Sequence, residues 1–495
     1  MSDPDLNSFI AWFQRNHGYI DTNAMGFKGF VPSEGGRGAV ALKDLPEGHV
    51  LFTIPRSLTL STRNSSLPKR LGMQFWKEKG LDKGWTGLIL CMMWETAQGV
   101  SSKWAEYLET LPKSFDTPMF WDKNNLGELA GTYVVDKLGK DDAERTYNEV
   151  LLPVVRSRPD LFPTDLIADY YSMEQYHIMG SRILSRSFDV ERWEGDEGNS
   201  DNDEAAETSV GSAMDVDQPA HSLTDDSARN EEPSDEEEED DIDVSMVPVA
   251  DLLNARYRTE NAKLFYESTE LKMLTTKPVS MGEQIWNTYG DLPNAELLRR
   301  YGHVDLMPLP GGGKGNPGDV AEIRADLIVS ALSEHPGRFP ESKVQEVIDW
   351  YLDEGGDDVL VIESDLELPS QLLTLIRLLL LSPEEFKKTR DKGKLPKNKV
   401  DLPLLDIAIR ALQLRAEEYP TTVEEDESLL RGDLPLNKYH AIVVRLGEKN
   451  ILRGCLQKAE ELRSACLEEP KLGKEQGKNK RKTNADNPPS KKSRK

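Results

Sequence analysis

The spacing of apolar and polar positions changes several times along the chain. Near the N-terminus, Phe9 and Phe13 fall at helical spacing and predict a short amphipathic helix over residues 5–18. Short alternating apolar runs, separated by Gly and Pro turns, then predict strands between residues 26 and 54. From residue 67 to residue 188 the spacing becomes helical. The first part of the chain is therefore predicted to be β-rich and to carry a helical insertion.

Strand signals resume at Met246, in the runs VPVADLL, AKLFYES and LKMLTTKPV. A Gly- and Pro-containing stretch, residues 308–317, has the composition of a linker. Residues 320–466 are helical almost throughout, with apolar side chains at i, i+3 and i+4 spacing. The pattern predicts an α+β fold, in which a β-rich domain split by a helical insertion precedes an all-helical C-terminal domain.

These changes of pattern also give the expected domain boundaries. The first domain spans residues 1–308, with the helical insertion at about 63–188 and an acidic loop at about 194–244. The helical domain spans residues 309–466, and a basic tail occupies residues 467–495. Both the loop and the tail lack core-forming side chains, so we expect them to be disordered.

The formal net charge of −26 comes mostly from one segment. Residues 194–244 contain 21 acidic residues and one basic residue, whereas residues 471–495 contain ten basic and two acidic residues. The acidic loop is either a solvated surface segment or an attractor of basic partner proteins. The two basic clusters of the tail, at 480–482 and 491–495, resemble a two-part nuclear import signal, with a nucleic-acid-binding tail as the alternative.

Composition also excludes several classes of protein. Three cysteines, Cys91, Cys455 and Cys466, are too few and too scattered for a disulfide framework or a thiolate zinc site. The most apolar run, Leu372–Leu381, contains Arg377 and is shorter than the roughly 20 residues that span a bilayer. We therefore expect a reduced intracellular protein without a metal site or a membrane span.

Three segments far apart in sequence carry unusual local chemistry. The first is the glycine-rich turn Gly36-Arg37-Gly38, where a backbone without Cβ atoms can approach a ligand closely. The second is Ser185-Arg186-Ser187-Phe188, whose guanidinium can bind a carboxylate. The third contains Asp251, Asn254, Ala255, Tyr289 and Tyr301. Taken one at a time, the glycine turn is explained equally well as a tight turn between strands. The arginine and a lone tyrosine are better explained as a helix-end arginine bound to carbonyls and as a core aromatic.

The order of these segments is more specific than any one of them. The glycine turn, helical insertion, SRSF, PVADLLN, NTYG and YG resemble the SET domain of protein-lysine methyltransferases of the Rubisco large-subunit methyltransferase-like class. The likeness extends to the groups of fungal ribosomal lysine N-methyltransferase 4 and animal SET-domain-containing protein 6, and covers roughly residues 5–466. It implies a split SET domain followed by a helical domain that helps to bind the substrate protein.

The resemblance also implies a role for each motif residue. Backbone groups of Gly36, Arg37 and Gly38 would contact S-adenosylmethionine. Ser185, Arg186, Asn254 and Ala255 would complete the cofactor site, with Arg186 near the cofactor carboxylate and Asn254 at its amino-acid end. Tyr289 would be the catalytic tyrosine and would also border the cofactor. Phe188, Asp251 and Tyr301 would line the channel for the substrate lysine, Asp251 in a structural role.

One motif position departs from the family. Many SET domains have Asn-His where this chain has Asn254-Ala255. Because main-chain atoms of that histidine make much of the adenine contact, the resemblance implies that alanine is tolerated. No cysteine-rich, zinc-holding flanks accompany the motifs.

The functional expectation is a lysine methyltransferase that uses S-adenosylmethionine and acts on a non-histone protein, a basic ribosomal protein in particular. One alternative is a nuclear methyltransferase of histones or transcription factors. Another is a non-catalytic SET scaffold that binds basic proteins through its acidic loop. We expect a monomer without direct nucleic-acid binding, located in the nucleus and also in the cytoplasm.

Overall fold

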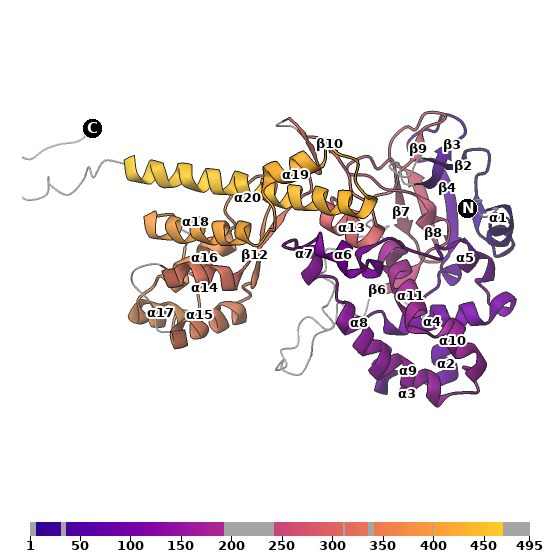
Figure 1. The fold of residues 1–495 in the computed structure, drawn as a ribbon. Helices are drawn as coiled ribbons and strands as arrows, with labels where there is room; N and C mark the ends of the chain where they lie inside the picture. The colour runs from indigo at the N-terminus through magenta and orange to yellow at the C-terminus, as the bar shows by residue number, and fades with distance from the viewer. Residues whose placement is uncertain are drawn as a thin grey trace, which may run out of the picture. The chain divides into compact units, whose positions relative to one another are not determined.

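The structure is a computed structural model that describes residues 6–30, 36–192, 242–309, 312–334, 341–397 and 399–468. The basic tail from residue 469 and the acidic loop from residue 193 to residue 241 lie outside the described residues. The predicted α+β fold is confirmed, since antiparallel sheets and many helices share the chain (Figure 1).

The strands of the first part are β1 (Tyr19–Ile20), β2 (Met25–Gly29), β3 (Arg37–Ala41), β4 (Val50–Pro55), β5 (Ser187–Glu191), β6 (Ile242–Met246), β7 (Ala262–Tyr266), β8 (Glu270–Thr275) and β9 (Gln284–Ile285). They form a four-stranded sheet in the order β1-β4-β8-β7, a three-stranded sheet β2-β3-β9 and the pair β5-β6. Every strand pairing in these sheets is antiparallel. Buried and half-buried positions alternate along β7 and β8, as expected for strands with one face against a core.

The helices of the first part are α1 (Leu6–Arg15), α2 (Leu67–Leu71), α3 (Met73–Glu78), α4 (Thr86–Ala97), α5 (Ala105–Thr110), α6 (Lys123–Gly127), α7 (Tyr133–Asp136), α8 (Lys140–Thr146), α9 (Leu152–Ser157), α10 (Ile167–Tyr170), α11 (Met173–Arg186) and α13 (Asn294–Tyr301). A π-helical turn, η5 (Tyr147–Leu151), joins α8 to α9. Short 3₁₀ turns are η2 (Arg56–Leu58), η3 (Gly99–Ser101), η4 (Pro118–Phe120), η6 (Thr164–Leu166) and η8 (Ala250–Leu252).

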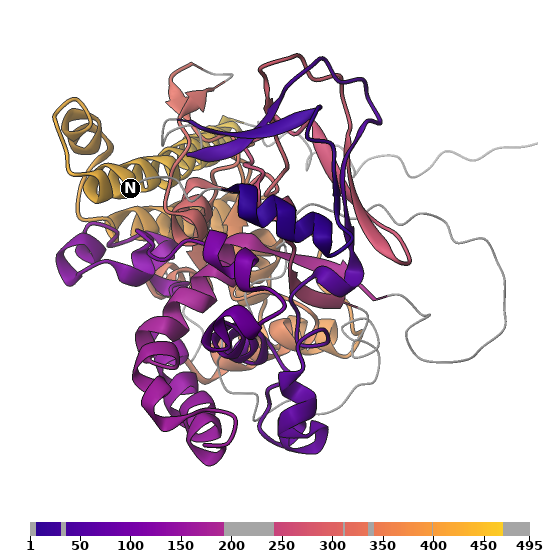
Figure 2. The same ribbon diagram turned by 90° about the vertical axis from the view of Figure 1, so that its right-hand side faces the viewer.

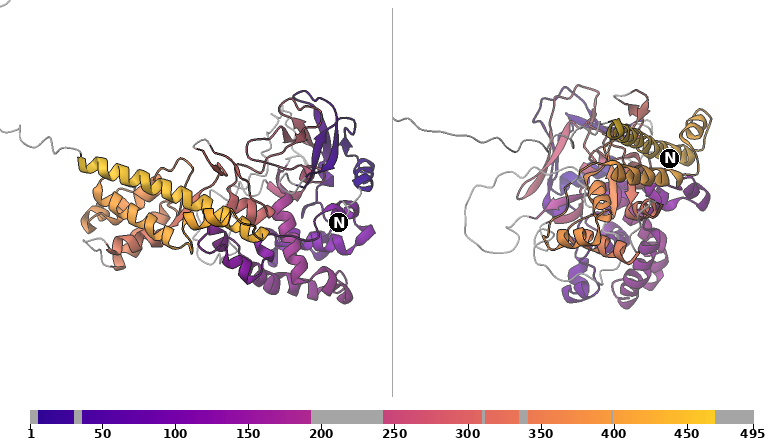
Figure 3. Two further views of the ribbon diagram at one scale, coloured as in Figure 1. Left: turned by 45° about the horizontal axis from the view of Figure 1, so that its top comes forward. Right: turned by 90° about the vertical axis from the view of Figure 1, so that its left-hand side faces the viewer.

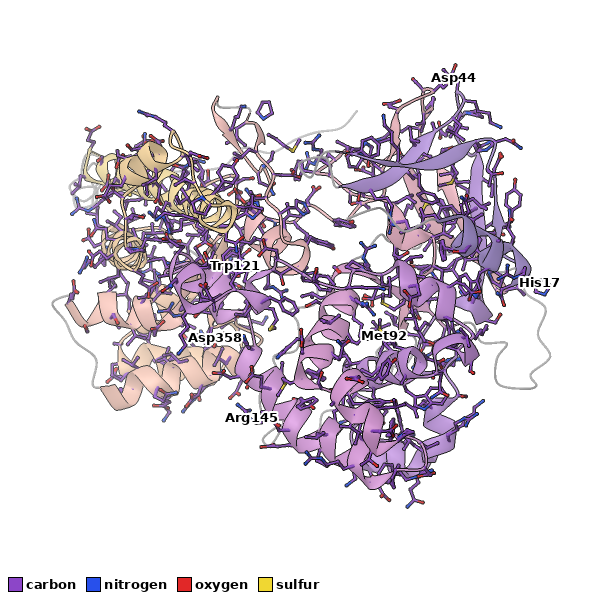
Figure 4. The ribbon with its side chains drawn as sticks, turned by 45° about the vertical axis from the view of Figure 1, so that its right-hand side comes forward. His17, Asp44, Met92, Trp121, Arg145 and Asp358 are labelled. Carbon is purple, nitrogen blue, oxygen red and sulfur yellow. The ribbon has the colours of Figure 1, made fainter. Side chains whose placement is uncertain are left out.

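Helix α4 is the centre of the helical insertion. Ten of its twelve residues are buried, which explains why its sequence is apolar on every side. Met92 on this helix lies inside the insertion (Figure 4). Helix α11 packs beside α4 (Figure 1), and its last residue, Arg186, is followed directly by strand β5. In Figure 2 the helices of the insertion, purple to magenta, lie together below the strands. The insertion therefore ends at the residues whose chemistry the sequence singles out.

Two sequence predictions fail around strand β6. Residues 242–244 were expected to belong to the disordered acidic loop, but Ile242 begins a strand whose residues pair with β5. The two acidic residues at 241 and 243 hid this strand in the composition. The run VPVADLL was expected to be a strand, but only Met246 before it is extended. Val249 has φ +74° and starts the 3₁₀ turn η8 instead.

The later elements are β10 (Met307–Pro308), β11 (Lys314–Gly315), β12 (Ala321–Arg324), α14 (Ala325–Glu334), α15 (Glu341–Asp353), β13 (Val359–Ile362), α16 (Ser370–Leu379), α17 (Pro383–Arg390), α18 (Leu402–Glu417), α19 (Val423–Leu429) and α20 (Leu436–Glu468). The predicted linker therefore contains the small antiparallel pair β10-β11. The C-terminal part is helical as predicted, apart from the paired strands β12 and β13, which at four residues each are too short to stand out from the helical pattern.

Two compact units can be distinguished by their contacts. The first comprises Met1–Glu322, Val361–Asp365 and Ala416–Leu452, and the second comprises Ile323–Leu360, Leu366–Arg415 and Arg453–Lys495. Helix α20, an uninterrupted helix of 33 residues, contributes residues to both (Figure 3). The domain boundaries given by the sequence pattern stay a prediction. Within the described residues, no helix is both long and apolar enough to cross a bilayer.

Candidate active site

Strand β3 places the glycine turn against the polar side chains of two other segments. Val40 of β3 pairs with Gln284 of β9, and on the other edge β3 pairs with β2. The side-chain amide of Asn254 donates a 2.8 Å hydrogen bond to Gln284 Oε1. A Cβ on Gly38 would lie 2.3 Å from that oxygen and 2.5 Å from Asn254 Nδ2. Glycine is required at position 38 because two amide side chains occupy the space.

The backbone after Asn254 is held by a second contact with the same region. The carbonyl of Asn254 accepts a 2.9 Å hydrogen bond from the amide of Asn287. Ala255 and Asn287 form an isolated parallel bridge. The segments PVADLLN and NTYG, more than thirty residues apart in sequence, therefore lie side by side through main-chain contacts. Ala255 takes part through its backbone, which alanine provides as well as histidine.

The other two residues of the glycine turn make different contacts. Gly36 has φ +68°, a left-handed conformation that favours glycine, and a Cβ there would meet no atom of the described residues within 4 Å. The Arg37 guanidinium donates to the carbonyl of Thr110 at 3.2 Å. The turn thus has a left-handed backbone at Gly36 and a side chain anchored to the end of α5 at Arg37.

Asp251 lies at the centre of a buried polar cluster. Its side chain is fully buried, and Tyr107 donates a hydrogen bond from its hydroxyl to Asp251 Oδ2 at 3.0 Å. Arg186 Nη1 donates to the main-chain carbonyl of Asp251 at 2.5 Å and lies 3.9 Å from Oδ2. Burial raises the pKa of Asp251 to about 6, although Arg186, Tyr107 and Arg37 all favour the carboxylate.

The remaining residues of the SRSF segment are held by their own elements. The Ser185 hydroxyl donates to the carbonyl of Ser181 at 2.7 Å, one turn earlier in α11. Phe188 is buried in β5, opposite Ser245 of β6. Arg186 therefore presents the polar group of this segment, and the carbonyl it binds belongs to the PVADLLN segment.

The two motif tyrosines form a stacked pair. The rings of Tyr289 and Tyr301 have centroids 4.2 Å apart and an interplanar angle of 5°. Burial raises the pKa of Tyr289, with Arg186 lowering it and Asp251 raising it further. Burial also raises the pKa of Tyr301, and the neighbouring Tyr289 adds to the rise. Both phenols therefore stay protonated at neutral pH and can donate hydrogen bonds.

Helix α13 fixes the position of Tyr301. The helix ends at Gly302, which has φ +75° and faces the carbonyl of Asp116 so closely that a Cβ would lie 3.0 Å from it. Leu298 and Ala295 of α13 join a small apolar cluster with Trp121, Leu129, Tyr133, Val134, Ala441 and Val444. Trp121 is one of the side chains labelled in Figure 4. Tyr301 is therefore held by a capped helix end and a packed helix face.

The structure brings most of the predicted site residues into two connected groups. One contains Gly38, Asn254 and Ala255, and the other contains Arg186 and Asp251, whose charges act on the stacked pair of Tyr289 and Tyr301. Turn η8 links them, since Asp251 lies in it and Asn254 follows it. Ser185 and Phe188 adjoin the second group along the chain, and their contacts run into their own elements.

Sequence reasoning missed three residues of this region. Gln284, Asn287 and Tyr107 are buried and contact Asn254, its carbonyl and Asp251 respectively. Asn287 opens the NTYG motif, and Tyr107 lies in the WAEYLETLP segment that supported the resemblance. These motifs were a signal for Asn287 and Tyr107, whereas nothing in the sequence around Gln284 distinguishes it from a strand residue. Among the residues with described positions, no group of His, Cys, Asp and Glu side chains could hold a metal ion.

Comparisons with known proteins agree with this geometry. The protein-family model described as Rubisco LSMT substrate-binding matches residues 338–452. Ribosomal lysine N-methyltransferase 4 of Saccharomyces cerevisiae is 30% identical over 339 residues, which cover 67% of this chain and 60% of the yeast protein. Human N-lysine methyltransferase SETD6 is 26% identical over 457 residues, which cover 85% of this chain and 84% of the human protein. The chain thus matches three fifths of the yeast protein's length.

Solved structures show the same fold. The SET domain of LSMT bound to lysine and AdoHcy superposes with a TM-score of 0.62 at 21% identity, covering 94% of this chain and 92% of that one. Rubisco LSMT bound to AdoMet gives a TM-score of 0.63 at 20% identity, covering 94% and 93%. Motif order, fold and sequence relatives agree in one similarity: the chain resembles the SET-domain protein-lysine methyltransferases of the Rubisco large-subunit methyltransferase-like class along most of its length.

Proposed function

We propose that this protein transfers methyl groups from S-adenosylmethionine to lysine side chains of a non-histone protein, a basic ribosomal protein in particular. The observation that carries the proposal is the joining of two groups by one short turn. The amide and glycine group suits a cofactor, and the tyrosine, arginine and aspartate group suits a lysine. Both groups come from motifs that lie far apart in the sequence.

The residues around β3 fit the cofactor's amino-acid end. Gly36 takes a left-handed conformation with no described residue beside its Cα, and Gly38 lets the amides of Asn254 and Gln284 approach the strand. Side-chain amides offer both donors and acceptors, which an ammonium and a carboxylate on one carbon need together. Asn254 would hold that end of S-adenosylmethionine. When bound, the sulfonium supplies an activated methyl group and a positive charge.

The second group suits the acceptor lysine. A lysine side chain titrates near 10.4 in water, and only the neutral amine is nucleophilic. Burial and a nearby positive charge both lower that pKa, and Arg186 adds a fixed positive charge near Tyr289. The protonated hydroxyl of Tyr289 and local carbonyl groups would orient the amine. Alignment of this kind is the main contribution that such a site makes to a direct displacement.

The alternative of a non-catalytic scaffold rested on Ala255. Its backbone forms the bridge to Asn287, and the Asn254 side chain bonds Gln284, so the cofactor side of the site is built without a side chain at position 255. This arrangement favours an active enzyme. Calorimetry with S-adenosylmethionine separates the two, because a scaffold of this sort would show no saturable binding.

The proposed class of acceptor protein is supported by the activity of a relative and by the charge of one segment of this chain. A relative of this chain is a ribosomal lysine N-methyltransferase, and the segment at 194–244 is strongly acidic. An acidic segment raises the encounter rate with basic proteins in a salt-dependent manner. The two basic clusters of the tail favour transport into the nucleus, where ribosomal proteins are assembled and where histones offer the alternative acceptor.

The test uses the purified full chain, S-adenosylmethionine labelled on the methyl group, and two acceptor sets in parallel. One set is ribosomal proteins, and the other is core histones. We expect label on a lysine of a ribosomal protein, located by mass spectrometry, and little on histones. Label confined to histones would replace the acceptor class but keep the chemistry. Cofactor binding without label on either set would contradict the proposed acceptors.

A further inference from the structure

A buried tyrosine of the helical insertion contacts the polar cluster of the site. Tyr107 on helix α5 donates its hydroxyl to Asp251 Oδ2 at 3.0 Å, across 144 residues of sequence. Both side chains are fully buried. Asp251 Oδ1 has no hydrogen-bond partner among the described residues. Within these residues, the Tyr107 hydroxyl is therefore the side-chain group that donates a hydrogen bond to the Asp251 carboxylate. A buried carboxylate without that donor would be poorly stabilised.

The ring of Tyr107 has little freedom to move. It stacks on Trp12 of helix α1, with ring centroids 6.3 Å apart and planes 10° apart, and lies 6.1 Å from Phe9. The Trp12 indole itself donates to the carbonyl of Lys103, just before α5. The phenol is therefore aimed at Asp251 by a packed aromatic group rather than by a flexible side chain.

Asp251, held by Tyr107, in turn contacts another residue of the candidate site. Its main-chain carbonyl accepts a 2.5 Å hydrogen bond from the Arg186 guanidinium, and Asn254 lies three residues further along the chain, just after turn η8. We propose that Tyr107 is a positioning residue for methyl transfer, whose hydroxyl holds Asp251, and through it Arg186, in place beside the other motif residues. This inference rests on the proposed function and adds to it a residue outside the motifs.

The hydroxyl also bears on the charge of the cluster. Asp251 is faced by Arg186 of α11, Arg37 of β3 and Tyr107 of α5, and its charge acts on Tyr289. Arg182 of α11 acts on Tyr107 in turn. Burial raises the pKa of Asp251 to about 6, and the Tyr107 hydrogen bond opposes that rise. Removing the hydroxyl raises the pKa further, by about one unit for a lost hydrogen bond to a charged group.

The experiment compares the full-length wild type with Tyr107→Phe from pH 5.5 to pH 8.5. The readout is the ratio of their kcat/KM values for the acceptor protein, in which titration of the substrate lysine cancels. We expect the ratio of the wild-type kcat/KM to the variant kcat/KM to be smallest at pH 8.5. The ratio should rise about tenfold as the pH falls through 7 and 6. In that window the carboxylate of the variant is protonated and that of the wild type is still charged.

Tyr147→Phe is the matched control. It removes another buried phenol, which donates to the carbonyl of Tyr171 at 2.8 Å within the helical insertion. Its activity ratio to wild type should be the same at every pH. A purely structural role of Tyr107 would give the same flat ratio, and that result would overturn the inference.

A second measurement needs no acceptor protein. The loss of melting temperature in Tyr107→Phe should grow by roughly 2–4 °C between pH 5 and pH 8, because only the charged form of Asp251 depends strongly on the hydroxyl. If the wild type labels no protein, the proposed function fails, and this measurement still decides whether Tyr107 controls Asp251. An equal loss at both pH values would contradict that control.

Discussion

Tyr289 and Tyr301 lie face to face, with ring centroids 4.2 Å apart and planes within 5° of each other. The rings are nearly parallel, and their centroid distance lies just below the roughly 4.5–7 Å that is usual for aromatic pairs. The close stack follows from where the rings are attached, since Tyr301 ends helix α13 and Tyr289 lies in the NTYG segment beside Asn254. Each ring therefore restricts the other, and the phenol of Tyr289 is held in one direction.

Replacing Tyr289 by Phe should distinguish the contribution of the ring stack from that of the hydroxyl. The ring contact with Tyr301 stays, while the hydrogen bond that orients the amine is lost. We expect kcat to fall by about tenfold to a hundredfold, the cost of one orienting hydrogen bond in the transition state. Steady-state kinetics with the labelled cofactor measures the fall. Cofactor affinity should stay within about threefold of wild type, and an unchanged kcat would remove Tyr289 from the catalytic step.

Gly38→Ala should affect the cofactor side of the site. The added Cβ would lie 2.3 Å from Gln284 Oε1 and 2.5 Å from Asn254 Nδ2, so the pair of amides must move. We expect the affinity for S-adenosylmethionine to fall by about tenfold or more, as for the displacement of a polar ligand contact. Gly127→Ala is the control, because a Cβ at Gly127 meets nothing within 4 Å. Equal calorimetric affinities for both variants would contradict the assignment.

Glu296 should stabilise the fold in a pH-dependent way. Its carboxylate contacts Arg299 at 2.7 Å and Arg300 at 2.6 Å, all three side chains being buried. Burial opposes ionisation, but the two arginines outweigh it and lower the pKa of Glu296 to about 2. Such a group stabilises the native state above its ordinary pKa, and the contribution is lost as the pH falls from about 4.5 towards 2.

The matching variant is Glu296→Gln. We expect it to lower the free energy of unfolding by about 3 kcal/mol at pH 7, from the difference between the two pKa values. Denaturant unfolding at pH 7, 5 and 3.5 measures it, and the gap to wild type should narrow at the lowest pH. A gap that is constant across the three pH values would show that packing, rather than charge, accounts for the loss.

His440 on helix α20 should destabilise the protein in acid. Burial and the neighbouring His303 together lower its pKa to about 4, and Asp116 partly opposes this shift. A histidine buried as the neutral form must be charged on unfolding in acid, so stability falls between about pH 6.5 and pH 4. We expect His440→Gln to remove about 2–3 kcal/mol of this fall. Unfolding curves of both proteins across that range test it, and parallel curves would be the contrary result.

The fold and much of the site were predictable because motifs carry local chemistry. Gly38, Asn254 and Tyr289 lie in short patterns, and their order along the chain indicated the class. The insertion helix α4 was predictable for the same reason, since its apolar side chains follow one another closely. Features that depend on residues close together along the chain can be predicted from a single sequence.

The missed features depend on partners that are distant in sequence or on backbone strain. Tyr107 acts on Asp251 across 144 residues, and the spacing of either one carries no sign of the other. Gln284 cannot be told from any other strand residue in the sequence, because only the pairing of β9 with β3 brings it to Asn254. Val249 reverses the chain at φ +74°, a conformation that β-branched residues rarely adopt, so its apolar neighbours were expected to form a strand.

The pairing of β5 with β6 has a consequence for protein engineering. Glu191 and Ile242 are partners across the ladder, so the chain leaves and re-enters the fold at adjacent points, although residues 193–241 separate them. Loop closure varies only with the logarithm of length, and replacing these residues by a two-residue hairpin turn should stabilise the fold by about 2–3 kcal/mol. The pairing of β5 with β6 should therefore tolerate large changes in the number of residues between them.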